Sequence, residues 1–356
     1  MKINALHLKH FRNIEEVWIE FCEGLNWLSG PNAAGKTNLL EALFYFVRAS
    51  SFRTRHLNEL ILTSKEYASL EIFFTKCAVE QSLKLIIRPE DKTLFHNQTS
   101  YKTALELLGI LQGVLIKLDD INLISGPPQL RRSFIDLQLV QSSPLYVHHL
   151  LRFQRALKHR NFCLKTKQLG PLDSFESEMV RSSNFLWEAR RALMERLQPL
   201  VQENYGRLSG EELFEIRYDA YSGNYQELLT KNRSHEIRLG YTKEGPHRDE
   251  MLFFIEGKPA KGFASEGQKR TAMMALKLAE WQSLHEIVGE KPLCAIDEWH
   301  SNLDKSHKRK LWDALEGLGQ VFITTHEVEP HQVSHQIQGG LAISLNTKWH
   351  QDEEGL

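Results

Sequence analysis

The feature that most constrains this chain is a glycine-rich loop close to its N-terminus. Residues 30–37 read Gly-Pro-Asn-Ala-Ala-Gly-Lys-Thr and fit the pattern G-x-x-x-x-G-K-[ST]. An apolar run of strand length, 25–29, precedes the loop, and the apolar residues of 37–48 recur at helical spacing. A strand, a glycine-rich turn and a helix in this order form the phosphate-binding loop of nucleoside triphosphatases. We therefore expect an α/β fold that binds such a nucleotide.

The chemistry of this loop assigns roles to its residues. The loop exposes backbone N–H groups to phosphate oxygens, and the following helix directs its positive end toward them. Lys36 is predicted to reach the β- and γ-phosphates of a nucleoside triphosphate, and the Thr37 hydroxyl to ligate Mg²⁺. The other predicted nucleotide contacts in the loop are Gly30, Pro31, Asn32, Ala33, Ala34 and Gly35.

A second predicted strand, 292–296, runs into two adjacent carboxylates. Such a strand can place Asp297 beside the metal ion, usually through water, while Glu298 orients and deprotonates the attacking water. An acidic turn after a strand is common by itself, so this interpretation depends on the phosphate loop. With the loop present, Lys36, Asp297 and Glu298 are the predicted catalytic residues.

Three further segments fit the same chemistry. Ser265, Gly267 and Gln268 stand at the start of a helical pattern over 267–288, and a hydroxyl and a glycine at a helix start can form a second phosphate-binding terminus. A Ser-Asn-Leu-Asp segment ending at Asp304 follows the acidic pair, and His326 follows another predicted strand, 320–324. Each of these patterns is weak when taken alone.

The pattern of the chain predicts two parts. Short strands, including 69–75 and 82–88, surround one helix in the first 100 residues, and strands alternate with helices after 213, among them 251–255, 303–315 and 341–345. Between them, 145–167 and 172–207 are helical in pattern and are separated by Gly170-Pro171. We expect an α/β head made of 1–100 and 240–356, with a mostly helical lobe, 101–239, inserted.

Composition limits the partners. Lys and Arg number 44 and Asp and Glu 45, a net charge of −1, so no global basic field indicates a polyanion partner. No run approaches the ~18 consecutive apolar residues of a membrane helix. The four cysteines have neither zinc-ligand nor disulfide-framework spacing, which fits a reducing cytosol. We expect a cytoplasmic protein with no membrane contact.

One stretch is locally basic. Residues 137–172 contain no Asp or Glu, and Arg152, Arg155 and Lys158 lie at helical spacing within them. A helix of this kind can follow DNA phosphates without reading bases, so these residues and Arg160 are predicted DNA contacts. The alternative is a solvated basic face that binds nothing. The Arg131-Arg132 pair is a weaker candidate.

The order of these elements resembles that of the ATP-binding-cassette ATPases: phosphate loop, serine-glycine signature, strand with Asp-Glu, Ser-x-x-Asp loop, and strand ending in histidine. Within that superfamily the chain resembles most closely the RecF family of bacterial DNA repair ATPases. The segments that carry this closer resemblance are 8–13, 35–42, 51–54, 126–136, 245–249 and 264–270. Ala33 and Glu266 occupy positions where relatives more often carry Gly and Gln.

The resemblance implies a specific mechanism. ATP would lie between two copies of the head, with Lys36, Thr37, Asp297 and Glu298 from one copy and Ser265 and Gly267 from the other. ATP binding would close this homodimer around duplex DNA, and a slow, DNA-stimulated hydrolysis would reopen it. Such proteins work with RecO and RecR on gapped or stalled-fork DNA and help load RecA.

Two other classes of protein contain the same head elements. The chain could be the ATPase subunit of a membrane transporter, although about 140 residues separate Lys102 from the segment 245–249, more than the short helical insertion that is usual there. It could also be a nucleotide-switched scaffold without catalysis. The presence of Glu298 favours an enzyme that hydrolyses the nucleotide over a scaffold without catalysis.

Overall fold

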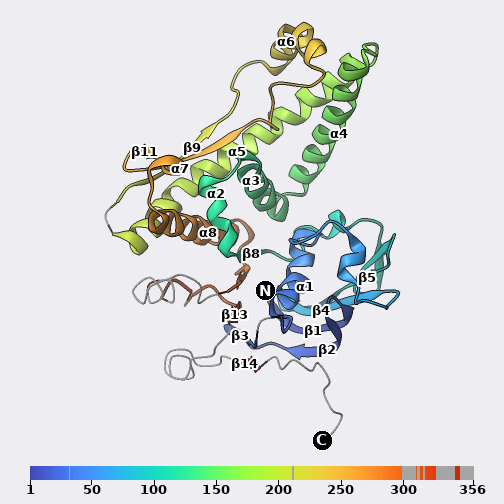
Figure 1. Cartoon of the computed structure of the whole chain (residues 1–356), viewed down its shortest axis with the longest axis vertical. Helices are drawn as coiled ribbons and strands as arrows, with labels where there is room; N and C mark the ends of the chain where they lie inside the picture. The colour runs from blue at the N-terminus through green and yellow to red at the C-terminus, as the bar shows by residue number, and fades with distance from the viewer. Residues whose placement is uncertain are drawn as a thin grey trace, which may run out of the picture. The chain divides into compact units, whose positions relative to one another are not determined.

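The computed structural model describes residues 1–31, 33–210, 212–298, 310, 313–315, 317–325 and 341–344. The chain divides into two compact units (Figure 1), a first unit of Met1–Asp119 with Glu280–Leu356 and a second unit of Asp120–Ala279. These boundaries differ from those expected from the sequence, 100/101 and 239/240. The difference arises because strands and short helices between 240 and 279 pack with the helices of the second unit.

A parallel sheet in the first unit positions the phosphate loop. Its strand order is β14-β3-β13-β12-β8, and all neighbouring strands are parallel. Long apolar runs suit such strands because a parallel sheet is covered on both faces. The bounds are β3 Leu25–Ser29, β8 Gly113–Ile116, β12 Leu293–Ile296, β13 Val321–Thr325 and β14 Leu341–Ser344. The predicted strands 25–29, 292–296, 320–324 and 341–345 are confirmed to within a residue, whereas β8 was not predicted.

An antiparallel sheet completes the first unit, in the order β2-β1-β4-β5-β6-β7. Its strands alternate buried and partly exposed residues, as one-sided sheets do. The bounds are β1 Lys2–Phe11, β2 Ile14–Glu20, β4 Ala68–Lys76, β5 Val79–Ile87, β6 Lys92–His96 and β7 Thr99–Tyr101, with short helical turns η1 Leu57–Leu60, η2 Ala104–Leu107 and η3 Leu118–Ile121. The predicted strands 69–75 and 82–88 correspond to β4 and β5.

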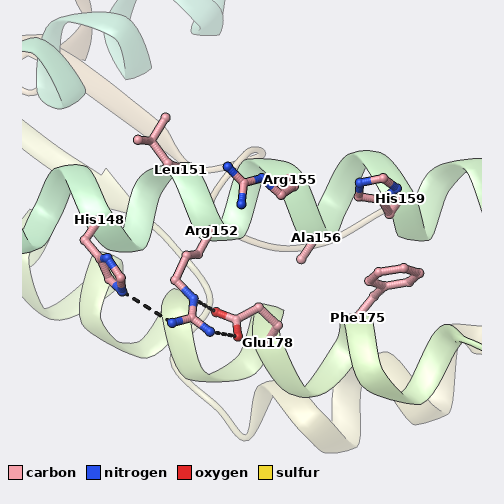
Figure 2. A pocket seen from close by; sticks show the side chains of 8 residues that line it. All are labelled: His148, Leu151, Arg152, Arg155, Ala156, His159, Phe175 and Glu178. Carbon is pink, nitrogen blue, oxygen red and sulfur yellow. Dashed lines mark hydrogen bonds and ion pairs between the residues drawn. The ribbon is translucent and has the colours of Figure 1, made fainter. Parts of the chain in front are cut away.

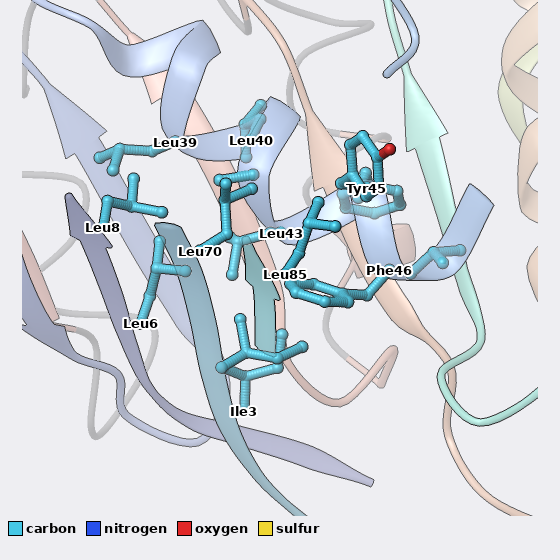
Figure 3. Close-up of a cluster of buried hydrophobic side chains, with 14 of the residues drawn as sticks. Ile3, Leu6, Leu8, Leu39, Leu40, Leu43, Tyr45, Phe46, Leu70 and Leu85 are labelled. Atoms are coloured by element: carbon cyan, nitrogen blue, oxygen red, sulfur yellow. The ribbon is translucent and has the colours of Figure 1, made fainter. Parts of the chain in front are cut away.

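Helix α1, Lys36–Arg48, packs its apolar face into the core of the first unit. Leu39, Leu40 and Leu43 of α1 are fully buried. Figure 3 shows them beside Ile3, Leu6 and Leu8 of β1 and Leu70 and Leu85 of the neighbouring strands. Burying such side chains contributes about 1.5–3 kcal/mol each, so the helix that follows the phosphate loop is fixed in place.

The second unit consists mainly of helices. Its helices are α2 Asn122–Ser125, α3 Pro128–Ser142, α4 Pro144–Thr166, α5 Leu172–Ser209, α6 Tyr225–Leu239, α7 Ala260–Phe263 and the start of α8, Glu266–Val288. A small antiparallel sheet, in the order β11-β10-β9, comprises β9 Phe214–Asp219, β10 Glu250–Ile255 and β11 Lys258–Pro259. Helices α4 and α5 lie side by side (Figure 1). The predicted helices 145–167, 172–207 and 267–288 and the break at 170–171 are confirmed, and most of the predicted helix 303–315 lies outside the described residues.

Two of the segments in which the chain resembles the RecF family contribute to the interior of the second unit. Asp249, from segment 245–249, and Asp136, from segment 126–136, both bind the buried Arg190, at 2.7 and 2.8 Å. Arg131 is also buried and pairs with Glu250 at 2.6 Å. Buried charges of this kind are stable only when they are paired. These residues therefore hold the unit together, and Arg131 is not available to DNA.

Among the described residues, no helix is both long and apolar enough to cross a membrane.

Candidate nucleotide-binding site

The described site begins where three parallel strands end. The phosphate loop follows β3, Asp297 follows β12, and Thr324 is near the end of β13, the strand between them. The Thr37 hydroxyl donates to Asp297 Oδ1 at 3.1 Å, and the Thr324 hydroxyl donates to the same oxygen at 2.7 Å. The sheet thus brings together the two residues predicted to hold the metal ion. Thr324 was not predicted, although a hydroxyl residue near the end of a buried strand was the available signal.

The Lys36 side chain folds back onto the backbone of the phosphate loop. Its Nζ donates to the backbone carbonyls of Gly30 at 2.6 Å and Pro31 at 2.8 Å. Burial lowers the pKa of Lys36 below its usual value, and the negative charges of Asp297 and Glu298 oppose that shift. An ammonium group held among backbone dipoles and two carboxylates is ready to exchange the carbonyls for phosphate oxygens.

The backbone of the loop is arranged for anions. Gly35 caps α1 in the left-handed conformation, with φ of 102°, and neither a capping side chain nor an acidic residue occupies the first turn of that helix. Within the described part of the chain, the first N–H groups of α1 and its positive end therefore remain for a ligand. Ala33 also adopts a positive φ, 65°, where glycine would be unstrained. The Asn13 side chain donates to the Ala33 carbonyl at 3.0 Å and supports this strained position.

Glu41 of α1 joins three of the segments in which the chain resembles the RecF family, 8–13, 35–42 and 51–54. It is fully buried and receives both Nε (2.9 Å) and Nη2 (2.6 Å) of Arg12. Ser51 donates a hydrogen bond to the same carboxylate, and Arg53 lies 3.4 Å from it. Segments 8–13 and 51–54 are thus tied to the helix that begins at the phosphate loop. Sequence reasoning missed this role of Glu41, because its partners are distant in sequence.

Glu298 lies next to Asp297 and is exposed. Its backbone adopts a positive φ of 61°, and its N–H donates to the Thr324 hydroxyl at 2.7 Å. A left-handed residue directly after the strand turns the chain sharply. The turn places the predicted base one residue beyond the predicted metal ligand, on a backbone that Thr324 holds.

The predicted signature lies at the start of α8, in the second unit. Gln268 N–H donates to Ser265 Oγ at 3.2 Å, and Ser265 N–H donates to Gln268 Oε1 at 3.0 Å, a reciprocal capping box. Ser265 and Gly267 are exposed. Glu266 pairs with Lys269 at 2.9 Å, which partly balances the extra charge at this helix start. The remaining predicted nucleotide contacts, Asn32, Asp304 and His326, lie outside the described residues.

The basic stretch on α4 divides into exposed and buried cations. Arg155 and Lys158 are exposed, and neither has an ion pair or hydrogen bond from its side chain within the described part of the chain. Arg152 is bound through two nitrogens by Glu178 of α5. Arg160 is fully buried and lies 2.8 Å from both Glu176 and Glu236. The prediction of Arg160 as a DNA contact is therefore wrong, since carboxylates on α5 and α6 enclose it.

A groove of about 530 Å³ lies between α4 and α5, lined in part by Arg152 and Arg155. Figure 2 shows the pair formed by Arg152 and Glu178 at one end and the rings of His159 and Phe175 at the other, with the small Ala156 between them. The two rings are stacked, 5.3 Å apart between centroids. The groove is thus largely apolar, with Arg155 and the Arg152–Glu178 ion pair at its border.

A phosphate loop on a parallel sheet, an acidic strand end hydrogen-bonded to it and a largely helical second unit define an ATP-binding-cassette type of ATPase head. The RecF/RecN/SMC N terminal domain family model matches residues 2–343, and the chain belongs to the RecF family.

The chain is 42% identical to the DNA replication and repair protein RecF of Protochlamydia amoebophila, over 94% of this chain and 96% of that one. It is 32% identical to RecF of Bacillus subtilis, over 92% and 94%. A solved structure of the recombination mediator protein RecF with ATP, in the RecFOR pathway, matches with a TM-score of 0.88 and 28% identity, over 96% and 95%. The transporter alternative is not favoured.

Proposed function

We propose that this chain is a recombination mediator that binds and slowly hydrolyses ATP in a DNA-stimulated reaction. Two copies enclose ATP and Mg²⁺, close on double-stranded DNA at gaps or stalled forks, and act in the cytoplasm with RecO and RecR to load RecA. Support for the mediator role comes from membership of the RecF family and from the relatives named for DNA replication and repair.

One observation carries the ATPase part of the proposal. Thr37 and Asp297 meet at 3.1 Å beside the buried ammonium of Lys36. Hydroxyl and carboxylate oxygens are the donors that Mg²⁺ prefers, so these two residues would hold the ion. When bound, Mg²⁺ neutralises phosphate charge, while Lys36 holds the phosphates and Glu298 takes a proton from the attacking water.

The geometry at Gly267 supports a shared site. A Cβ added there would meet only Ser265 Oγ, at 3.8 Å, among the described residues, and Gly267 has no left-handed backbone. Nothing in the described part of its own chain requires glycine at this position. A glycine at this exposed helix start permits close approach by a ligand, and we propose that the phosphates of ATP held by a second copy approach it.

DNA contact is proposed for Arg155 and Lys158, and more weakly for Arg152. The first two cations are exposed, one helical turn apart, on an acid-free helix. Phosphate contacts of this kind bind duplex DNA without sequence preference. The buried Arg160 is left out of this set.

Light scattering with and without ATP and a short gapped duplex tests the proposal. ATP should convert a monomer to a dimer, and the duplex should join the dimer and raise turnover. An unchanged mass together with no turnover would contradict it. A dimer that forms without any turnover would favour the scaffold without catalysis.

A further inference from the structure

Glu212 links the long helix α5 to the signature segment. It lies in the loop between α5 and β9, where its Oε2 accepts from the Tyr205 hydroxyl at 2.9 Å and its Oε1 accepts from Gln268 Nε2 at 3.0 Å. Tyr205 is fully buried. Burial and the hydrogen bond to Glu212 raise the pKa of Tyr205, so its hydroxyl remains a donor. Both carboxylate oxygens of Glu212 are thus occupied by donors from different elements.

The contact with Glu212 fixes the orientation of the Gln268 amide. Its nitrogen donates to Glu212, so its oxygen faces the N–H of Ser265, at 3.0 Å. The N–H of Gln268 in turn donates to Ser265 Oγ at 3.2 Å. That oxygen accepts from the helix, and no acceptor for the hydroxyl proton of the exposed Ser265 lies among the described residues, so this proton can be donated to a ligand.

The loop that carries Glu212 is itself held in place. Gln198 and Gln202, four residues apart on α5, accept from the N–H groups of Ile216 at 2.6 Å and Phe214 at 2.7 Å. These N–H groups belong to β9, the edge strand of its sheet. The two glutamines therefore fasten β9 to α5 in place of another strand. Glu212 sits between two anchored elements, so its position is set by α5.

We propose that Glu212 is a positioning residue for ATP hydrolysis, which holds Gln268 and the Ser265 hydroxyl in the orientation that ATP bound by a second copy requires. This inference rests on the proposed function, in which Ser265 acts on the ATP of the other copy. Glu212 itself belongs to neither the phosphate loop nor the strand end with Asp297. Its loss should therefore spare ATP binding and impair closure and turnover.

Glu212→Ala is the first test. ATP affinity, measured by calorimetry, should stay within about twofold, while ATP-dependent dimerisation and turnover should fall about tenfold or more, because the signature loses its fixed orientation. Glu203→Gln is the matched control, because Glu203 lies near Glu212, on the last turns of α5, and forms an exposed pair with Arg207. The control should behave like the parent chain in every measurement.

An exchange of the two side chains separates positioning from folding. Gln268→Glu alone places two carboxylates against each other at the 3.0 Å contact and should also lower turnover. The double variant Glu212→Gln/Gln268→Glu restores one donor and one acceptor at that contact and keeps Tyr205 and Ser265 N–H supplied with acceptors. Its turnover should be clearly higher than that of Gln268→Glu alone. A double variant no better than Gln268→Glu would overturn the inference.

Mixing variants tests whether Glu212 acts on the other copy. A mixed dimer of Glu212→Ala and Glu298→Gln contains one intact composite site. That site combines the phosphate loop and Glu298 of the Glu212→Ala chain with the signature of the Glu298→Gln chain. The mixture should therefore turn over ATP faster than either variant alone, and a mixture no faster than either would refute the inference. If the parent chain neither dimerises nor hydrolyses ATP, the proposed function fails instead, and that result is visible before any Glu212 variant is made.

Discussion

Thr37 and Asp297 are 260 residues apart in sequence and share a hydrogen bond of 3.1 Å at the edge of the parallel sheet. Thr324 binds the same carboxylate oxygen from the strand between them. The two proposed metal ligands are therefore held together by the protein itself. A site built in advance in this way loses little entropy when its ligand arrives.

Replacing Lys36 with alanine should abolish tight ATP binding. Lys36 is the side-chain cation at the loop, and losing charge-assisted bonds to the phosphates should weaken affinity by about 100-fold or more. Lys76→Ala is a matched control, because Lys76 also donates to two backbone carbonyls, at 2.7 and 3.1 Å, and burial likewise lowers its pKa. Calorimetry should find parental affinity in the control. Parental affinity in Lys36→Ala would remove the phosphate-loop assignment.

Glu298→Gln should keep ATP binding and stop turnover. A base for the attacking water is dispensable for holding the nucleotide, since Lys36, Thr37 and the backbone hold the phosphates. Turnover should fall about 100-fold or more, and the ATP-closed dimer should accumulate and retain DNA longer. Light scattering and a turnover assay check both effects.

Ser265→Arg should have the opposite effect on dimerisation to Glu298→Gln. ATP should still bind each copy, but the bulky side chain at the exposed signature should keep the copies apart. Mixing it with Glu298→Gln leaves one composite site with a sound signature opposite a sound phosphate loop, so partial dimerisation should return. The shared-site mechanism fails if Glu298→Gln stays monomeric with ATP while Ser265→Arg dimerises.

Sequence patterns predicted what is local in the chain. The strand-loop-helix unit, the acidic strand end and the two long helices were found, because their periodicity and spacing are written in consecutive residues. Ion pairs between side chains of different helices could not be predicted from sequence patterns. The acid-free run on α4 suggested a free basic face, but Glu176 and Glu178 of α5 meet Arg160 and Arg152 across the helix pair. Glu41 shows the same limit, since its partners come from segments distant in sequence.

Arg155→Ala/Lys158→Ala should weaken duplex binding and reduce its salt dependence. Each lost phosphate contact removes about 0.9 from the slope of log K on log salt, so the double variant should lose about 1.8. Arg207→Ala/Lys231→Ala removes two cations elsewhere on the second unit and should leave the slope unchanged. Fluorescence anisotropy over a salt series checks the result. An unchanged slope in the first variant would assign the α4 cations to a solvated face.

Arg160→Met should lower stability instead of DNA affinity. Its removal leaves Glu176 and Glu236 buried with fewer partners, and breaking a buried ion pair from one side costs about 3–5 kcal/mol. Urea unfolding measures the loss. A variant as stable as the parent but with a flatter salt slope for DNA would restore Arg160 as a DNA contact.

His247 should make the protein less stable in mild acid. Burial lowers its pKa to about 4, and the charges of Arg248, Arg132 and Arg190 act in the same direction, while its contact with the Thr242 carbonyl opposes them. The folded chain therefore keeps this imidazole neutral at pH values where the unfolded chain, with a pKa near 6.5, takes up a proton. The unfolded state binds more protons below about pH 6.5, so the free energy of unfolding falls as the pH drops toward 4, by about 1.4 kcal/mol per pH unit.

Comparison with His247→Gln isolates this contribution, because glutamine can still donate to the Thr242 carbonyl but does not titrate. Between about pH 7.5 and about pH 5, the parent should lose about 2 kcal/mol more unfolding free energy than the variant. The variant is expected to start lower at neutral pH, since its side chain fills the contact with Phe153 less well than the imidazole ring does. Urea unfolding at both pH values gives the two differences. Parallel losses in the two proteins would mean that His247 takes up its proton equally in the folded and unfolded chains, and that another group sets the acid sensitivity.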